Sequence, residues 1–175
     1  MRIADLNFKK YLTREVLEER IRELGESISN DYKGQDLLLI SILKGSFIFT
    51  ADLVRNIDLP VELEFIQLSS YRGTESTGSI QEKIPFEKDV SGRNVILIDD
   101  ILDTGLTISY LHEKISSLNP SSIEIASLLL KPEVFQDKLN VKYLGFEVPN
   151  LFLVGYGLDL DGIGRNLPDL YVRDS

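Results

Sequence analysis

Apolar residues recur at helical spacing in two stretches of the chain. The first runs from Thr13 to about Asn30, and the second ends at Asn119-Pro120, where the proline stops a helix. Thr13 is expected to cap the first helix, with Glu15 in its first turn. The apolar faces consist of Leu17, Ile21, Leu24 and Ile28 in the first helix and of Ile108, Leu111, Ile115 and Leu118 in the second.

Short apolar runs typical of strands alternate with these helices. The predicted strands cover residues 37–43, 61–69, 94–98, 123–130 and 151–156. Residues 47–55 predict a further helix, and the polar, glycine-containing residues 70–79 predict a loop. Strands that alternate with helices favour βαβ units, so we expect an α/β fold with a mostly parallel central sheet flanked by helices. Ligands of such sheets bind at the carboxyl ends of the strands.

Length and composition narrow the class of protein. A chain of 175 residues with 43% hydrophobic residues predicts one globular domain over residues 1–175. The net charge of −9 argues against a non-specific nucleic-acid binder, which needs cations for phosphates. The absence of cysteine and the single histidine exclude disulfides, a thiolate zinc site and a histidine metal cluster. No apolar run is long enough to span a membrane, and the first residues lack a signal pattern, which predicts a cytoplasmic protein without a membrane partner.

The richest candidate for chemistry lies between the strand that starts at residue 94 and the helix that follows it. Residues 95–107 read VILIDDILDTGLT and place three carboxylates, two threonine hydroxyls and a glycine at a helix start. A helix N-terminus offers unpaired N–H groups and the positive end of the dipole, so it favours a phosphate. Carboxylates repel that phosphate but suit sugar hydroxyls, a hydrated divalent cation or a proton in transfer. The segment therefore predicts a site for a phosphorylated sugar and a metal ion. A capped helix after an acidic surface turn is the simpler alternative, which the length of the run disfavours.

VILIDDILDTGLTI resembles the phosphoribosyl-pyrophosphate motif of the type I phosphoribosyltransferases. Four flanking segments resemble, in order, segments of the hypoxanthine-guanine branch of that family. They are LLISILKGSFIF, LSSYRGTESTG, SLLLKPE and YLGFEVPNLFLVGYGLDLDGIGRNLPDLY. The resemblance implies a small hood formed by the chain ends beside the sheet. It also implies Mg²⁺-dependent transfer of 5-phosphoribosyl from phosphoribosyl pyrophosphate to N9 of a 6-oxopurine, hypoxanthine or guanine, in purine salvage.

The same resemblance assigns roles at the sugar phosphate. Asp99 and Asp100 are implied to hold the ribose hydroxyls and Mg²⁺, and Asp103 to be the acid/base at purine N7. The 5′-phosphate loop matches Thr104, Gly105, Leu106 and Thr107, of which Leu106 departs from relatives that carry lysine and would act through its amide.

Further assignments concern the base and pyrophosphate. Lys131 is implied to donate to the 6-oxo group, Phe152 to stack on the purine, and Leu153 to contact it through its backbone. Asp159 matches a ligand of a second Mg²⁺ and Arg165 a pyrophosphate-binding arginine, while Gly164 replaces an aromatic residue of some relatives. Lys44-Gly45 matches the pyrophosphate loop, where we expect a cis peptide bond between these two residues, and Ser70-Tyr71 matches a mobile loop over the site.

Two other readings stay open from the residues. Phosphoacceptor receiver domains also contain an acidic pair at a strand end and a Lys-Pro pair, as Asp99-Asp100 and Lys131-Pro132 do here. In this chain, however, the segment between the two pairs leaves no room for the strand that carries the phosphoacceptor. A phosphoribosyltransferase-like regulator without catalysis is disfavoured by Asp103 and Lys131. The preference among hypoxanthine, guanine and xanthine is not readable from the sequence, and relatives imply a homodimer or homotetramer.

Overall fold

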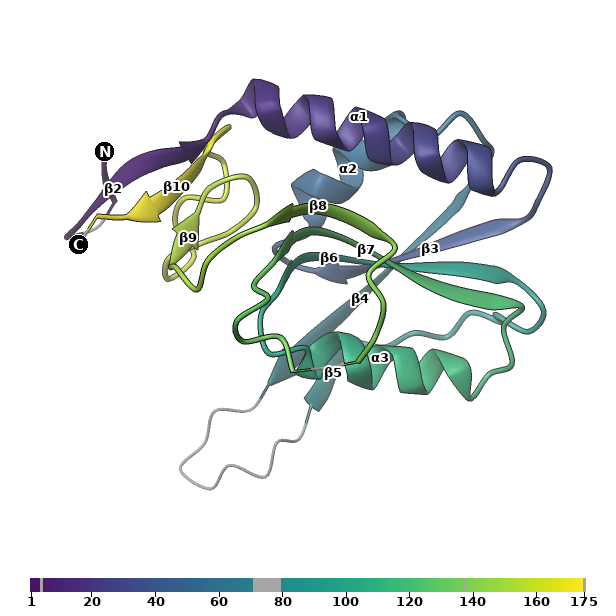
Figure 1. Ribbon diagram of the computed structural model, residues 1–175. Helices are drawn as coiled ribbons and strands as arrows, with labels where there is room; N and C mark the ends of the chain where they lie inside the picture. The colour runs from purple at the N-terminus through teal and green to yellow at the C-terminus, as the bar shows by residue number, and fades with distance from the viewer. Residues whose placement is uncertain (4, 71–79, 137, 175) are drawn as a thin grey trace.

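A six-stranded sheet forms the main layer of the computed structural model, which describes residues 1–3, 5–70, 80–136 and 138–174 (Figure 1). The strand order is β5-β4-β3-β6-β7-β8, and every neighbouring pair is parallel except β4 with β5. These strands are β3 (Leu37–Leu43), β4 (Glu62–Ser70), β5 (Ile80–Ile84), β6 (Asn94–Leu102), β7 (Ser122–Leu130) and β8 (Tyr143–Glu147). The predicted mostly parallel sheet is confirmed.

In the described part of the chain, three helices cover the two faces of this sheet. Helices α1 (Arg14–Asp31) and α2 (Phe47–Arg55) pack on one face, and α3 (Leu106–Ser116) packs on the other (Figure 1). The predicted apolar stripe of α1 is buried, and the Thr13 hydroxyl accepts a hydrogen bond from the amide of Val16 at 3.5 Å. Of the helices in the described ranges, none combines the length and apolar character that crossing a bilayer requires.

A second, smaller sheet joins segments from both ends of the chain. Its order is β1-β2-β10-β9, all antiparallel, and it lies beside the main sheet as the expected hood (Figure 1). The strands are β1 (Arg2–Ile3), β2 (Leu6–Leu12), β9 (Leu153–Val154) and β10 (Leu170–Arg173). Asp169 connects the hood to α1, because its carboxylate accepts from the Arg14 amide at 2.8 Å and pairs with the Lys10 ammonium at 2.6 Å.

Some element boundaries differ from the prediction. The strand predicted to end at residue 98 continues as β6 to Leu102, because its ladder with β7 extends to the pair Leu102 and Leu130. Asp99 and Asp100 therefore belong to the strand rather than to a loop after it. The apolar run 151–156 forms only the two-residue β9, which belongs to the hood. The strand ends there because the chain continues with glycines in the left-handed conformation, beginning at Gly155.

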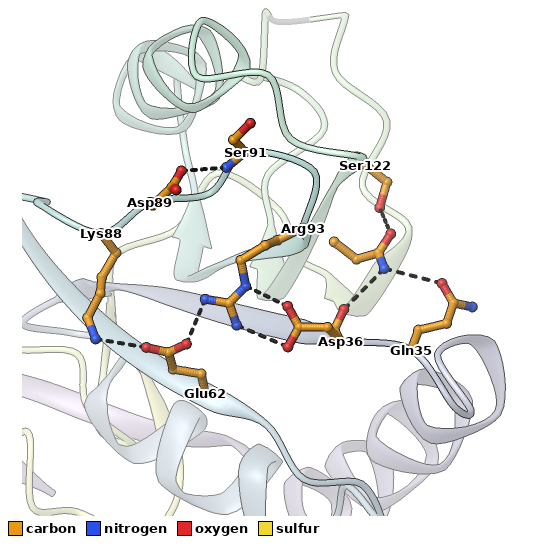
Figure 2. A network of polar contacts seen from close by, with 9 residues as sticks. Gln35, Asp36, Glu62, Lys88, Asp89, Ser91, Arg93 and Ser122 are labelled. Carbon is orange, nitrogen blue, oxygen red and sulfur yellow. Dashed lines mark hydrogen bonds and ion pairs between the residues drawn. The ribbon is translucent and has the colours of Figure 1, made fainter.

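A network of ion pairs and hydrogen bonds connects the amino ends of β3, β4 and β6, at the edge of the sheet opposite to the predicted site. The Arg93 guanidinium donates two hydrogen bonds to Asp36, at 2.5 and 3.1 Å, and one to Glu62, at 2.6 Å (Figure 2). Lys88 reaches the other oxygen of Glu62 at 2.8 Å. Arg93 thus links the segments that precede β3 and β6 to the start of β4.

Replacing Arg93 by methionine is expected to lower the melting temperature by about 2–4 °C. Methionine keeps most of the apolar stem but removes a forked donor that satisfies two carboxylates, and the arginine side chain is only 21% exposed. Circular dichroism melting measures the change. Lys33→Met, at an exposed cation in the turn after α1, is the control and should melt like the parent. An unchanged melting temperature for Arg93→Met would show that the network contributes nothing to stability.

Candidate active site

The predicted site residues gather at the carboxyl ends of β3, β6 and β7, which are neighbours in the sheet. Lys44 and Gly45 follow β3, Asp103 follows β6, and Lys131 follows β7. The Lys131 amide donates to the Leu102 carbonyl at 3.0 Å, which places the ends of β6 and β7 side by side. Parallel packing thus brings together residues that are far apart in the sequence.

A small hollow lies at the N-terminus of α3. It has a volume of about 80 Å³ and is lined by Asp99 and by residues 101–108. Gly105 precedes the helix with φ 89°, a left-handed conformation that suits glycine. Thr107 is half-buried and Thr104 is exposed, while the Leu106 side chain is 65% exposed, so residue 106 offers its amide rather than its side chain. The hollow has the donors and the helix dipole that an anion needs.

Two neighbouring residues of β6 carry carboxyl groups, and the first of them, Asp99, lines this hollow. Asp99 is 7% exposed, and its Oδ1 accepts from the Asp100 amide at 3.0 Å. Burial raises the pKa of Asp99 well above its ordinary value, and the charge of Asp100 raises it further. Burial also raises the pKa of Asp100, an effect that its hydrogen bonds with Asp99 and with the backbone, and then the nearby Arg165 charge, partly offset. Two desolvated carboxyls side by side favour a cation between or beside them.

The loop after β3 contains a cis peptide bond, but between Leu43 and Lys44. Our prediction of a cis bond between Lys44 and Gly45 is therefore wrong by one residue. Gly45 serves a different purpose: a Cβ there would lie 1.7 Å from Oδ2 of Asp100, so only glycine lets this carboxylate approach the loop. Gly157 is equally constrained, since its Cβ would lie 2.1 Å from the Gly45 carbonyl oxygen.

Three buried hydroxyl groups form hydrogen bonds with one another and with the backbone next to this loop. The Ser41 hydroxyl lies 2.8 Å from that of Ser46 and 2.7 Å from that of Thr50, and Ser46 donates to the Ile42 carbonyl at 2.5 Å. All three side chains are at most 1% exposed. Sequence reasoning missed them, although a serine within the apolar run 37–43 was a visible signal.

Lys131 is only 8% exposed and stands between two side-chain oxygens. Its Nζ lies 3.4 Å from Asp103 Oδ2 and 3.4 Å from Asn150 Oδ1. Asp103 itself is exposed, with 53% of its side chain accessible. The structure therefore brings the predicted acid/base and the predicted base-reading lysine into contact, and it adds Asn150, which nothing in the sequence singled out.

An aromatic pair lies where the hood meets the site. The Phe152 side chain is 46% exposed, and its ring centroid lies 6.4 Å from that of the buried Phe8, with the planes inclined at 51°. Leu153 follows in β9 and is buried. A Cβ at Gly164 would meet Val154 Cγ1 at 2.4 Å inside the hood, so the missing side chain at 164 affects hood packing rather than this exposed ring.

Arg165 and Asp159 form an ion pair behind the loop after β3. Arg165 Nη2 lies 2.6 Å from Asp159 Oδ1, and Nη1 donates to the Gly157 carbonyl at 2.7 Å. The other oxygen of Asp159 accepts from the Gly162 amide at 2.7 Å. Both Asp159 oxygens are thus engaged in this structure.

Two predicted residues lie at the edge of the described chain. Ser70 is the last residue of β4, while Tyr71 and the rest of the predicted loop to residue 79 lie outside the described residues. Within the described ranges, no three acidic, histidine or cysteine side chains are grouped closely enough to hold a metal ion by themselves.

Comparison with known proteins places this geometry in a family. The family model of the phosphoribosyl transferase domain matches residues 8–161. The chain belongs to the type I phosphoribosyltransferase family, as its strand-end motif and hood indicate. Within that family its similarity is to the hypoxanthine-guanine phosphoribosyltransferases.

Two relatives and one solved structure illustrate the similarity. The Aquifex aeolicus hypoxanthine-guanine phosphoribosyltransferase is 42% identical over 97% of this chain and 97% of its own. That of Mycobacterium tuberculosis is 44% identical over 89% of this chain and 81% of its own. The crystal structure of a Staphylococcus aureus hypoxanthine phosphoribosyltransferase superimposes with a TM-score of 0.90 at 38% identity, covering 97% of this chain and 92% of the other.

Proposed function

We propose that this chain transfers the 5-phosphoribosyl group from phosphoribosyl pyrophosphate to N9 of hypoxanthine or guanine in purine salvage. The products are IMP or GMP and pyrophosphate. The observation that carries the proposal is the contact of Asp103 with Lys131, 3.4 Å apart, beside an anion hollow. A 6-oxopurine presents O6 and N7 side by side on one edge, with the proton on N7 when N9 is free to react, so a lysine donor next to a carboxylate acceptor can serve both atoms.

The sugar phosphate fits the β6–α3 segment. The 5′-phosphate would occupy the hollow, held by the amides of residues 105–107 and the hydroxyls of Thr104 and Thr107. Asp99 and Asp100 would accept hydrogen bonds from the ribose hydroxyls. The approach of Asp100 to Gly45 brings these carboxylates next to the loop that would bind pyrophosphate.

The donor set fits Mg²⁺ that arrives with the substrate. Magnesium in proteins commonly takes one or two carboxylates and completes its shell with substrate phosphates and water. Asp99 and Asp100 supply such a pair, and Asp159 could join for a second ion only by giving up Arg165. When bound, the metal supplies charge neutralisation for the departing pyrophosphate. Arg165 and the backbone of Lys44-Gly45 add donors to the same group.

At the purine, each group has a distinct task. Phe152 would stack on the base, Leu153 would contact it through its backbone, and Lys131 would donate to O6. As N9 bonds to C1′ and the bond from C1′ to pyrophosphate breaks, the Asp103 carboxylate would take the proton from N7. This leaves a neutral base in the product nucleotide. Ser70 and Tyr71 would belong to the segment that covers the reacting atoms.

The test is turnover with a panel of bases at saturating phosphoribosyl pyrophosphate and Mg²⁺. Hypoxanthine and guanine are expected to react, and adenine to react at least about a hundredfold less well, because Lys131 would face an amino donor instead of an oxygen. Product formation is followed by absorbance and chromatography, with xanthine included to define the range. Equal turnover of adenine and hypoxanthine would contradict the assigned role of Lys131, and no turnover of any base would contradict the proposed reaction.

A further inference from the structure

Asn150 owes its position to the order of three neighbouring strands. Asp103 follows β6, Lys131 follows β7, and the chain after β8 reaches Asn150. The buried Val148 amide donates to the Leu130 carbonyl at 2.8 Å, which fixes the segment after β8 against the end of β7. Lys131 consequently has a carboxylate on one side and a carboxamide on the other.

The two groups that contact the Lys131 ammonium differ in charge, although their oxygens lie at the same distance from it. Asp103 Oδ2 and Asn150 Oδ1 each lie 3.4 Å from Lys131 Nζ, and within the described part of the chain these are the side-chain oxygens seen on this ammonium. An ammonium has three N–H donors, so two contacts leave one N–H for an oxygen of a ligand. Asn150 can hold the ammonium without adding a second negative charge beside it.

We infer that Asn150 is a positioning residue for the purine: it holds the Lys131 ammonium at the O6 side of the base and away from full pairing with Asp103. The inference rests on the proposed function, in which Asp103 must remain able to accept the N7 proton. A lysine paired with Asp103 alone would hold that carboxylate in an ion pair and would turn away from O6. Asn150 gives the ammonium a second, neutral acceptor at the same distance as Asp103.

The first experiment replaces Asn150 by alanine and by aspartate. Asn150→Ala is expected to raise KM for hypoxanthine about tenfold, the size of one hydrogen bond to a charged group, while KM for phosphoribosyl pyrophosphate stays unchanged. Asn150→Asp returns an acceptor oxygen but adds a second negative charge beside the ammonium, so it is expected to bring KM for hypoxanthine only part of the way back. Asn140→Ala, at an exposed asparagine in the connection between β7 and β8, is the matched control and should behave like the parent.

A double-mutant cycle separates positioning from a merely structural effect. If Asn150 acts through the lysine, Asn150→Ala should cost nothing further in KM for hypoxanthine once Lys131→Met is present. The same tenfold loss in that background, an unchanged KM in Asn150→Ala, or a parallel rise in KM for phosphoribosyl pyrophosphate would each overturn the inference. Because Asn150 is exposed, folding of the variants is expected to persist and is checked by melting. A parent protein that converts no base would overturn the proposed function instead.

Discussion

Replacing Asp103 by asparagine is expected to lower kcat by about 10²–10⁴-fold, the usual contribution of a general acid/base. Asparagine has nearly the same shape and can still contact Lys131, but it cannot take a proton from N7. The affinity for phosphoribosyl pyrophosphate should not fall, since Asp103 lines the hollow but its carboxylate repels a phosphate instead of binding it. Steady-state kinetics with hypoxanthine, together with calorimetric titration of phosphoribosyl pyrophosphate, measure the two quantities separately.

Thr107→Ala is the matched comparison for this variant. Thr107 lines the hollow, so its loss should weaken phosphoribosyl pyrophosphate and leave kcat at saturation much less affected. Opposite signatures for the two variants would support the division of the site into a chemical and a binding half. Full turnover by Asp103→Asn would remove Asp103 from the chemistry.

Replacing Gly45 by alanine is expected to lower kcat/KM for phosphoribosyl pyrophosphate about a hundredfold, the cost of displacing a site group by about 1 Å. A Cβ at 45 would overlap the Asp100 carboxylate, with Oδ2 at 1.7 Å and Cγ at 2.5 Å. The Asp100 side chain must then rotate away from its position next to Asp99. Initial rates at varied phosphoribosyl pyrophosphate and Mg²⁺ concentrations measure the loss, and the melting curve shows that the fold persists.

Gly34→Ala controls for the general cost of adding a side chain to a glycine. No atom lies within 4 Å of a Cβ at this position, but its φ of 76° strains alanine by about 1–2 kcal/mol. We expect lower stability with unchanged kinetics, the reverse of the pattern at Gly45. Parent-like kinetics in Gly45→Ala would show that Asp100 has no fixed role at the loop.

The sequence predicted β3, β4, β6 and β7 of the main sheet, because local signals and tertiary contacts agree there, but it did not predict the edge strands β5 and β8. Residues 37–43 and 47–55 were predicted to the residue, since an apolar run and an apolar helix face are both buried in the core. The hood followed only from family resemblance, because β1 has two residues and too little pattern to detect, and the run 151–156 that contains β9 predicted a strand without indicating its partner. The extension of β6 through Asp99 and Asp100 runs against local preference, since aspartate is depleted in strands, and it depends on pairing with β7.

The candidate site was predictable where one continuous segment carries it and not where distant segments meet. Residues 99–107 lie together in the sequence and in space. Phe8 and Asn150 became visible only through their neighbours Phe152 and Lys131, which lie on other elements. Gly45 was assigned to the pyrophosphate loop by resemblance, but what requires a glycine there is the approach of Asp100 from a different strand.

The pairing of β2 with β10 also determines which part of the structure can form last while the chain is being synthesised. Leu12 pairs with Leu170 and Phe8 with Arg173, so the hood joins residues that are synthesised about 8–30 s apart at 5–20 residues per second. The six strands of the main sheet, which end at Glu147, leave the ribosome earlier and can form the sugar-phosphate side first. The ring of Phe152 gains its support from Phe8 only once β10 has emerged. A nascent chain therefore acquires the wall that would face the purine last, after the half that would bind the charged substrate.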